Sequence, residues 1–235
     1  MSTVRAVLVC CALLGAGCDR VFGLDDRAAT VIPLQEVTSA GDGSAPSLDV
    51  AVQPTSAGST LVVVVAIRTE VVPIATLADS AGNVWMKALD GPDSLSSSSG
   101  RFEIWYATNA APITTLTLTA RDPRVIAASF TEWDAVAPSL TVLAANALPA
   151  DRSTTPSTGP VTTTAPALVI AVTAVPGAAV PTLETPGFTA FSPFQGSGLS
   201  GSAAFAVVPA GTYDVGWTLP QIEDWTAGIV GFRLN

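Results

Sequence analysis

The hydrophobic residues of this chain fall into short runs separated by turn residues, and helical periodicity is nearly absent after residue 30. The runs are rich in β-branched and aromatic residues, which predicts strands at 47–53, 60–68, 83–89, 101–108, 113–120, 124–133, 167–174, 202–208, 212–219 and 225–234. Turn-forming clusters occupy 80–83, 90–94 and 150–160. Short strands at this spacing are typical of an all-β sandwich or barrel.

Two kinds of strand can be distinguished. The runs LVVVVAI (61–67) and LVIAV (168–172) are apolar on both faces, as in a sheet that is covered on both sides. The runs ITTLTLTA (113–120) and TYDVGWTL (212–219) alternate, as in a sheet with one buried face. A lipid-facing barrel would need longer alternating strands with aromatic girdles. The pattern therefore favours a two-sheet antiparallel sandwich, either jelly-roll-like or immunoglobulin-like.

The approach to each fully apolar strand is similar in the two halves of the chain. The stretches are QPTSAGSTLVVVVAI (53–67) and PSTGPVTTTAPALVIAV (156–172), and both pass from Ser, Thr and Gly into an apolar run. One interpretation is a pseudo-repeat that places equivalent strands in the two sheets. The other is a shared bias in composition. The sequence leaves both open.

The first residues have the order of a secretory signal peptide: a positive charge at Arg5, an apolar run from Ala6 to Leu14, and small residues up to Gly17. As a helix this run rises only about 14 Å, whereas crossing a bilayer takes about 20 apolar residues. We therefore expect residues 1–17 to be a cleaved signal helix. All three cysteines lie in this region, at positions 10, 11 and 18, so the remaining chain cannot form an internal disulfide.

The stretch LLGAGC (13–18) resembles the lipobox of bacterial lipoproteins, with Gly15 at the position where that family usually has leucine. The resemblance implies that Cys18 is acylated and becomes the first residue of the mature chain, so that membrane lipid is a partner. Ordinary cleavage would instead leave Cys18 as a free thiol, which is a liability in an oxidising compartment. We expect a lipid-anchored tether over 18–30 and a single β-sandwich domain over 31–235, on the periplasmic or cell-surface side of a membrane in the bacterial cell envelope.

Composition excludes several classes of function. Loss of Arg5 with the leader changes the formal net charge from −9 to −10, which argues against a nucleic-acid partner. The chain has no histidine, so a Ser-His-Asp or Cys-His mechanism is excluded and zinc loses its usual nitrogen ligand. The glycine-rich stretch GSGLSGS (196–202) lacks the lysine of a phosphate-binding loop and is expected to be a turn. We expect no cofactor and no metal site.

The body of the chain also resembles a family of secreted bacterial β-sandwich domains, which occur alone or attached to extracellular enzymes. The resemblance lies in DSAGNVW (79–85), IWYATN (104–109), the TTT-then-LVIAV run and the closing DWTAGIVGF (224–232). It implies a sandwich fold and an extracellular setting. These motifs are turn and core patterns, so they assign no catalytic residues.

Two tryptophans are the leading candidates for ligand contact. Strict alternation in NVWMKAL and RFEIWYAT puts Trp85 and Trp105 on the polar faces of their strands. The apolar faces would be formed by Val84, Met86 and Ala88 in one strand and by Phe102, Ile104 and Tyr106 in the other. The polar neighbours are Asn83, Lys87, Arg101 and Glu103. Exposed rings beside such groups would suit sugar recognition; alternatively, a loop or the N-terminal segment covers them.

The acidic residues give weaker candidates. Glu132 and Asp134 share a face at a spacing comparable to that of glycosidase carboxylates, but paired surface acids are common. Asp90 and Asp93 form a possible calcium loop that lacks the full ligand set, so an ordinary turn is favoured. The pair at 223–224 is expected in a solvated turn.

No catalytic residue is assigned, and the chain is not expected to be an enzyme. The sequence predicts a non-catalytic binding or adhesion module with polysaccharide as the candidate ligand. The alternative is a structural or assembly protein that contacts another envelope protein through its sheet surface.

Overall fold

A computed structural model describes residues 32–68, 73–91, 100–134 and 142–234. The strands over this part of the chain are antiparallel and no helix occurs among the described residues, so the predicted all-β antiparallel sandwich is confirmed. One compact unit spans Pro33–Asn235. The expected signal helix, the tether, Cys18 and Asp93 lie outside the described residues. In the described part, no helix is long and apolar enough to cross a membrane.

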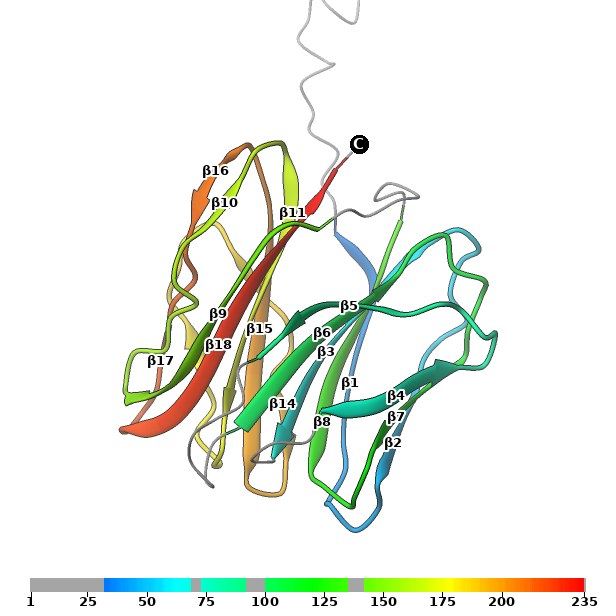
Figure 1. Ribbon diagram of the computed structural model, residues 1–235, viewed down its shortest axis with the longest axis horizontal. Helices are drawn as coiled ribbons and strands as arrows, with labels where there is room; N and C mark the ends of the chain where they lie inside the picture. The colour runs from blue at the N-terminus through cyan, green and yellow to red at the C-terminus, as the bar shows by residue number, and fades with distance from the viewer. Residues whose placement is uncertain (1–31, 69–72, 92–99, 135–141, 235) are drawn as a thin grey trace, which may run out of the picture. The chain divides into compact units, whose positions relative to one another are not determined.

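Two five-stranded paths form the centre of the unit. The first sheet has the order β1 (Pro33–Ala40), β8 (Ile126–Trp133), β3 (Thr60–Arg68), β6 (Gly100–Ala107), β5 (Met86–Asp90). The second sheet has the order β9 (Val142–Ser153), β18 (Glu223–Arg233), β11 (Ala167–Val175), β15 (Leu199–Val208), β13 (Thr189–Ala190), and β14 (Phe194–Gly196) also pairs with β15. Figure 1 shows the two sheets side by side, the first on the right and the second on the left.

Smaller sheets cover the outer face of each central sheet. The first cover consists of β2 (Ser47–Ala51), β7 (Thr115–Ala120) and β4 (Ile74–Asp79). The second cover consists of the pair β10 (Val161–Thr163) and β16 (Gly211–Tyr213) and the pair β12 (Thr182–Leu183) and β17 (Trp217–Thr218). Each cover encloses a separate hydrophobic core with its central sheet. The described strands thus form five sheets rather than two, because each central sheet has two apolar faces to bury.

The strand order reveals an internal repeat. We define the first repeat as β1 to β8 (33–133) and the second as β9 to β18 (142–233). We number the strands within each repeat. In each central sheet the first strand of the repeat then pairs with the last, and the third strand lies at the centre. The central strands are β3 and β11, to which the two similar sequence stretches lead. The pseudo-repeat interpretation is therefore confirmed.

The central strands are apolar on both faces because both faces are buried. Val63 and Val65 of β3 lie in the core beneath the first cover. Val62 and Val64 point to the other face by alternation and are equally buried, against the second sheet. The predicted range 60–68 matches β3, and the range predicted for β11 ends one residue early.

The two central sheets meet through aromatic side chains. The rings of Tyr106 and Phe232 pack edge to face with centroids 5.3 Å apart. The rings of Trp133 and Phe205 do the same at 5.1 Å. The backbone carbonyl of Gly100 also accepts a hydrogen bond from the Thr226 hydroxyl at 3.1 Å, which joins β6 to β18.

Several sequence predictions of strands and turns were wrong at the edges of the sheets. Strands β1 and β4 were not predicted, because an edge or cover strand has few buried positions: in these two strands only Ile74 is buried, so neither has a clear apolar period. Strand β9 was missed because its sequence, VLAANALPADRS, contains four alanines and a proline, which are depleted in strands, and it continues to Ser153, inside the predicted turn cluster. Glu223 and Asp224 lie in β18, not in a turn. The predicted turn at 196–202 is confined to residues 197–198, between β14 and β15.

Candidate functional site

The candidate site lies on β5 and β6, on the face of the first sheet that the first cover encloses in part. Arg101, Glu103 and Trp105 share this face of β6, while Phe102 and Ile104 are buried on the other, so the predicted alternation is confirmed. The polar side chains are not displayed to solvent, however. Arg101 and Glu103 are both buried. The sequence placed them on a polar face correctly but could not show that this face is covered.

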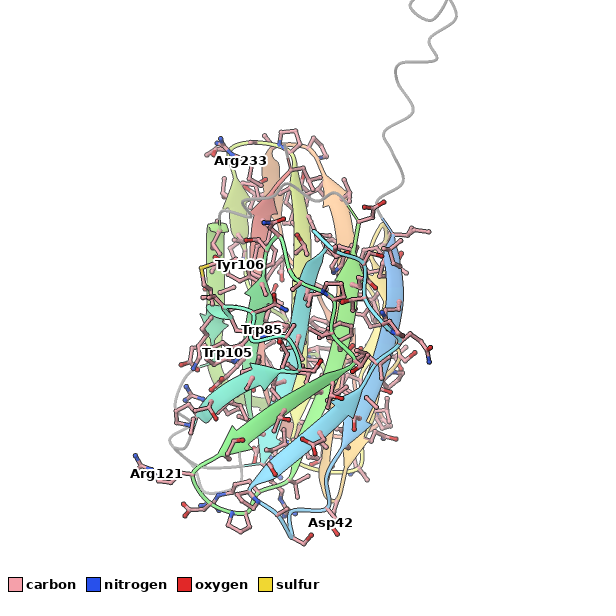
Figure 2. All side chains as sticks on the ribbon, turned by 90° about the vertical axis from the view of Figure 1, so that its right-hand side faces the viewer. Asp42, Trp85, Trp105, Tyr106, Arg121 and Arg233 are labelled. Atoms are coloured by element: carbon pink, nitrogen blue, oxygen red, sulfur yellow. The ribbon has the colours of Figure 1, made fainter. Side chains whose placement is uncertain are left out.

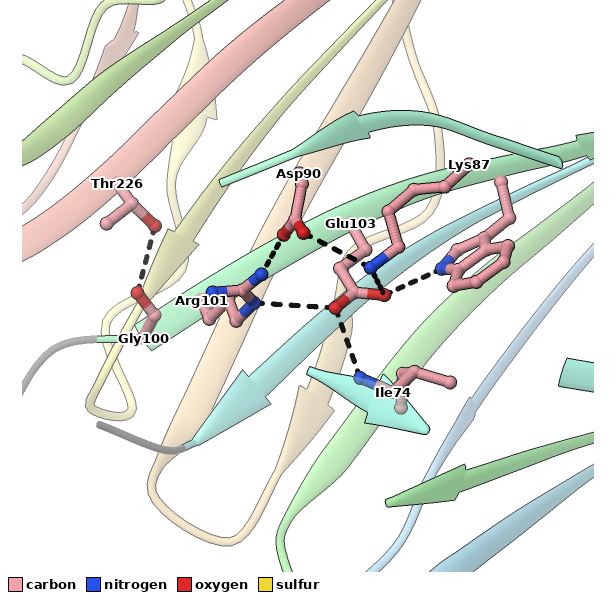
Figure 3. Close-up of polar contacts among 8 residues, drawn as sticks. Ile74, Lys87, Asp90, Gly100, Arg101, Glu103 and Thr226 are labelled. Atoms are coloured by element: carbon pink, nitrogen blue, oxygen red, sulfur yellow. Dashed lines mark hydrogen bonds and ion pairs between the residues drawn. The ribbon is translucent and has the colours of Figure 1, made fainter. Parts of the chain in front are cut away.

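Glu103 is the centre of a network of charged groups (Figure 3). One carboxylate oxygen, Oε1, accepts hydrogen bonds from the backbone N–H of Ile74 at 3.1 Å and from Nε of Arg101 at 3.4 Å. The other, Oε2, accepts a bond from the indole Nε1 of Trp105 at 2.7 Å and pairs with Nζ of Lys87 at 3.2 Å. The carboxylate is fully buried, and its partners replace the water that burial removes.

Asp90 completes this network at the solvent boundary. Its carboxylate pairs with Nζ of Lys87 at 3.2 Å and with the guanidinium of Arg101. The side chain of Asp90 is 41% exposed and that of Lys87 is 25% exposed. We call Lys87, Asp90, Arg101, Glu103 and Trp105 the charged cluster. It contains two cations and two anions, so it is formally neutral, and it reaches solvent through Lys87 and Asp90.

The two candidate tryptophans have different surroundings. Both are half-buried and pack against the core beneath the first cover, and Figure 2 shows them on the same side of the body. The ammonium of Lys87 lies 4.8 Å from the ring centroid of Trp105. A sugar stacking on that face of Trp105 would have to displace Lys87.

Trp85 belongs to a neighbouring turn that Asp79 organises. The indole Nε1 of Trp85 donates to Oδ2 of Asp79 at 2.8 Å. The same carboxylate accepts bonds from the backbone N–H groups of Ala81 and Asn83. Burial raises the pKa of Asp79, but these bonds outweigh burial and hold the pKa below its ordinary value. Asn83 further ties the turn to Ala111. The structure thus divides the sequence-predicted residues between the charged cluster and the Asp79 turn.

The predicted apolar face formed by Val84 and Met86 was wrong. Val84 is 80% exposed and Met86 is 41% exposed. Strand β5 begins only at Met86 and has a bulge between Lys87 and Leu89, so strict alternation does not hold along the predicted strand 83–89. The bulge lies after Val84, Trp85 and Met86, however, and exposure still alternates over 83–87. The covered face is the one that carries Trp85, so the two apolar side chains on the opposite face are displayed at the edge of the first sheet.

Glu132 has a structural environment that its pairing with Asp134 did not reveal. Glu132 is buried and Asp134 is exposed. Oε1 of Glu132 accepts bonds from the backbone N–H of Ser56 at 2.6 Å and the hydroxyl of Ser59 at 2.8 Å. Oε2 accepts a bond from the Gln35 amide at 2.7 Å. Glu132 therefore joins β1, β8 and the segment before β3 rather than facing an open site.

Glu132 should make stability depend on pH. Burial raises its pKa, but the hydrogen bonds from Gln35, Ser56 and Ser59 outweigh burial and hold the pKa below the ordinary value of 4.5. A carboxyl whose pKa is lower in the folded state contributes stability above its unfolded pKa, and that contribution is lost as pH falls through the folded pKa. We expect Glu132→Gln to weaken the loss of stability below pH 4.5, measured by urea unfolding across an acidic series, whereas Asp134→Asn should leave it unchanged. Equal acid dependence in wild type and Glu132→Gln would contradict this.

The charged cluster is a feature of the first repeat only. We match Thr60 of β3, which pairs with Trp133, to Leu168 of β11, which pairs with Phe232. In this register Glu103, which pairs with Val65, corresponds to Ser202, which pairs with Thr173. In the same register Arg101 corresponds to Ser200 and Trp105 to Ala204. The second repeat builds the same central sheet without these charges, so the sheet architecture does not require them.

Comparison with known proteins adds no assignment: no family model, no curated protein and no solved structure matches this chain. Among the described residues, no group of histidine, cysteine, aspartate and glutamate is arranged to hold a metal ion.

Proposed function

We propose that this protein is a lipid-anchored protein of the bacterial cell envelope that acts by binding rather than by catalysis. Its ligand-contacting region is the part of the charged cluster that reaches solvent, with Lys87, Asp90 and Trp105, together with Trp85 and Asn83, and polysaccharide is the candidate ligand. One observation carries the proposal: β6 of the first repeat bears Arg101, Glu103 and Trp105 where the second repeat has small residues in the same sheet. Burying charged groups costs free energy, and the second repeat forms the same sheet without them. We therefore infer that these residues have a role outside folding.

The carboxylates support binding over catalysis. A general acid or base needs a pKa near the working pH and a free oxygen near the substrate. Both oxygens of Glu103 are bonded, Oε1 to Ile74 and Arg101 and Oε2 to Trp105. Both oxygens of Glu132 are also bonded, and its pKa is lowered. By contrast, the two half-buried tryptophan rings lie beside Lys87, Asp90 and Asn83, so a sugar that displaces the Lys87 ammonium from Trp105 would gain a stacking surface with hydrogen-bonding groups around it.

The anchor can be tested through Cys18. The expected result is that the native chain incorporates labelled palmitate and that Cys18→Ala abolishes incorporation and releases the protein from membranes. Mass spectrometry of the native amino terminus gives an independent readout. Cys10→Ala is the matched control, because that residue lies within the expected leader. An unmodified mature amino terminus in the wild type would contradict lipidation.

Ligand binding can be tested with the mature chain and a panel of bacterial and plant polysaccharides in affinity electrophoresis. For a polysaccharide that binds, Trp105→Ala and Trp85→Ala should each weaken affinity by about tenfold, equivalent to 1.4 kcal/mol. Ile222→Ala is the control, because Ile222 is an exposed apolar residue outside the cluster. If the wild type retards on no member of a broad panel, polysaccharide is not the ligand.

A role in envelope assembly is the second candidate, and Val84 and Met86 favour it. These exposed apolar side chains lie at β5, an edge strand that pairs only with β6 among the described strands. Edge strands with exposed apolar residues are typical sites of association. A photo-crosslinking residue at position 84, but not at position 222, should then capture one defined envelope protein in living cells. Equal capture from both positions would contradict the assignment.

A further inference from the structure

We infer that the chain is a fused dimer of its two repeats, and that the contact between Phe102 and Gly228 makes the first repeat pair with the second repeat and reject a second copy of itself. The face of the first sheet that bears Phe102 therefore has the second repeat of the same chain as its partner.

The interface is reciprocal. In the first sheet Trp133 pairs with Thr60 of β3, and Tyr106 pairs with the residue two positions later. In the second sheet Phe232 pairs with Leu168 of β11, and Phe205 pairs with the residue two positions later. Trp133 thus corresponds to Phe232, and Tyr106 to Phe205.

The contacts between the sheets follow this correspondence. Trp133 packs on Phe205, and Tyr106 packs on Phe232. Exchanging the two repeats therefore converts each contact into the other. This is the pattern of an isologous interface, in which the same surface serves both partners.

One position breaks the equivalence. Phe102 pairs with Ala66 in the first sheet, and at the equivalent position of the second sheet Gly201 pairs with Ala174. The fully buried ring of Phe102 lies against Gly228. A Cβ atom at position 228 would be 2.3 Å from Cζ of Phe102, so only glycine leaves room for this ring. Phe102 is thus a knob on one repeat, and Gly228 is its hole on the other.

The first repeat cannot supply this hole to itself. Gly228 pairs with Val172, and the equivalent residue of the first repeat is Ser129, which pairs with Val64. Two copies of the first repeat would therefore bring Phe102 against the Cβ of Ser129. In two copies of the second repeat the residue equivalent to Phe102 is Gly201, which has no side chain to fill the hole at Gly228 and is itself packed against Phe194. A steric clash against the wrong pairing together with a fitted contact in the right one gives specificity. The Ser129 hydroxyl is buried without a hydrogen-bond partner among the described residues, so it does not contribute such a bond to the interface.

The experiment uses the mature chain with a protease site inserted between Asp134 and Val142. Two versions carry different affinity tags on the first repeat. After cleavage they are mixed in urea below the unfolding midpoint to allow exchange, and one tag is captured. The expected result is recovery of the second repeat in equal amount and no recovery of the first repeat with the other tag. Loss of the second repeat on cleavage, or capture of one first repeat by another, would overturn the inference.

Two substitutions test the specificity directly. Phe102→Ala removes the knob, and the differently tagged first repeats should then capture each other. Gly228→Ser fills the hole, and recovery of the second repeat should fall at least tenfold, whereas Ala81→Ser in an exposed turn should have no effect. If Phe102→Ala does not fold, the Gly228→Ser result decides: undiminished recovery of the second repeat in that variant would refute the knob and hole.

Discussion

Replacing Glu103 by leucine is expected to lower the free energy of unfolding by about 3–5 kcal/mol, the usual cost of removing one partner from a buried ion pair. The carboxylate is fully buried and binds Lys87, Arg101 and the Trp105 indole. Without it the two cations would lose their buried counter-charge, and their other carboxylate partner, Asp90, is partly exposed and so screened by solvent. Urea unfolding followed by circular dichroism measures the change.

The matched control removes the cations together with the anion. The variant Lys87→Met, Arg101→Met, Glu103→Leu should lose less stability than Glu103→Leu alone, because no uncompensated charge is left near the core. A triple variant that is less stable than the single variant would show that the charged cluster holds the sheet together. It would also remove the main support for a role in binding.

Replacing Trp133 by alanine should cost about 3–5 kcal/mol, the typical penalty for truncating a buried aromatic side chain. Trp133 is fully buried, its ring contacts Phe205 and Phe191, and its indole donates to Thr131 at 2.9 Å. For a chain of this size, each kcal/mol shifts the melting temperature by about 2–4 °C. Thermal unfolding followed by circular dichroism gives the readout.

The repeat supplies the control for this substitution. Phe232 occupies the equivalent position and contacts Tyr106, so Phe232→Ala should destabilise the protein by a similar amount. Val84→Ala, at an exposed edge, should change little. A melting temperature within about 2 °C of the wild type for both interface variants would mean that the two central sheets do not depend on each other.

The predictions from sequence were most accurate for the strands that the fold buries completely. The strand β3 was predicted with its observed bounds because consecutive valines satisfy a sheet covered on both faces. The strands β1 and β4 were missed because they have almost no buried positions to set a period, and β9 because its alanines and proline are not typical of strands.

The candidate site shows the same division. Alternation placed Arg101, Glu103 and Trp105 on one face of β6, and that placement is confirmed. At Val84 and Met86 the expected burial was wrong, because these residues share the exposed face while Trp85 on the other face packs toward the core. No sequence pattern predicted that Glu103 accepts a hydrogen bond from the backbone N–H of Ile74, because the two residues lie in different strands.

By itself, the sequence determined the fold class, the central strands and the similarity of the two halves, because these follow from local hydrophobic patterns. Tertiary structure decided that the similarity is a true repeat, that the polar face of β6 is covered, and that Phe102 meets Gly228. Each of these depends on which surfaces meet in space, and packing between distant segments has no periodicity along the chain.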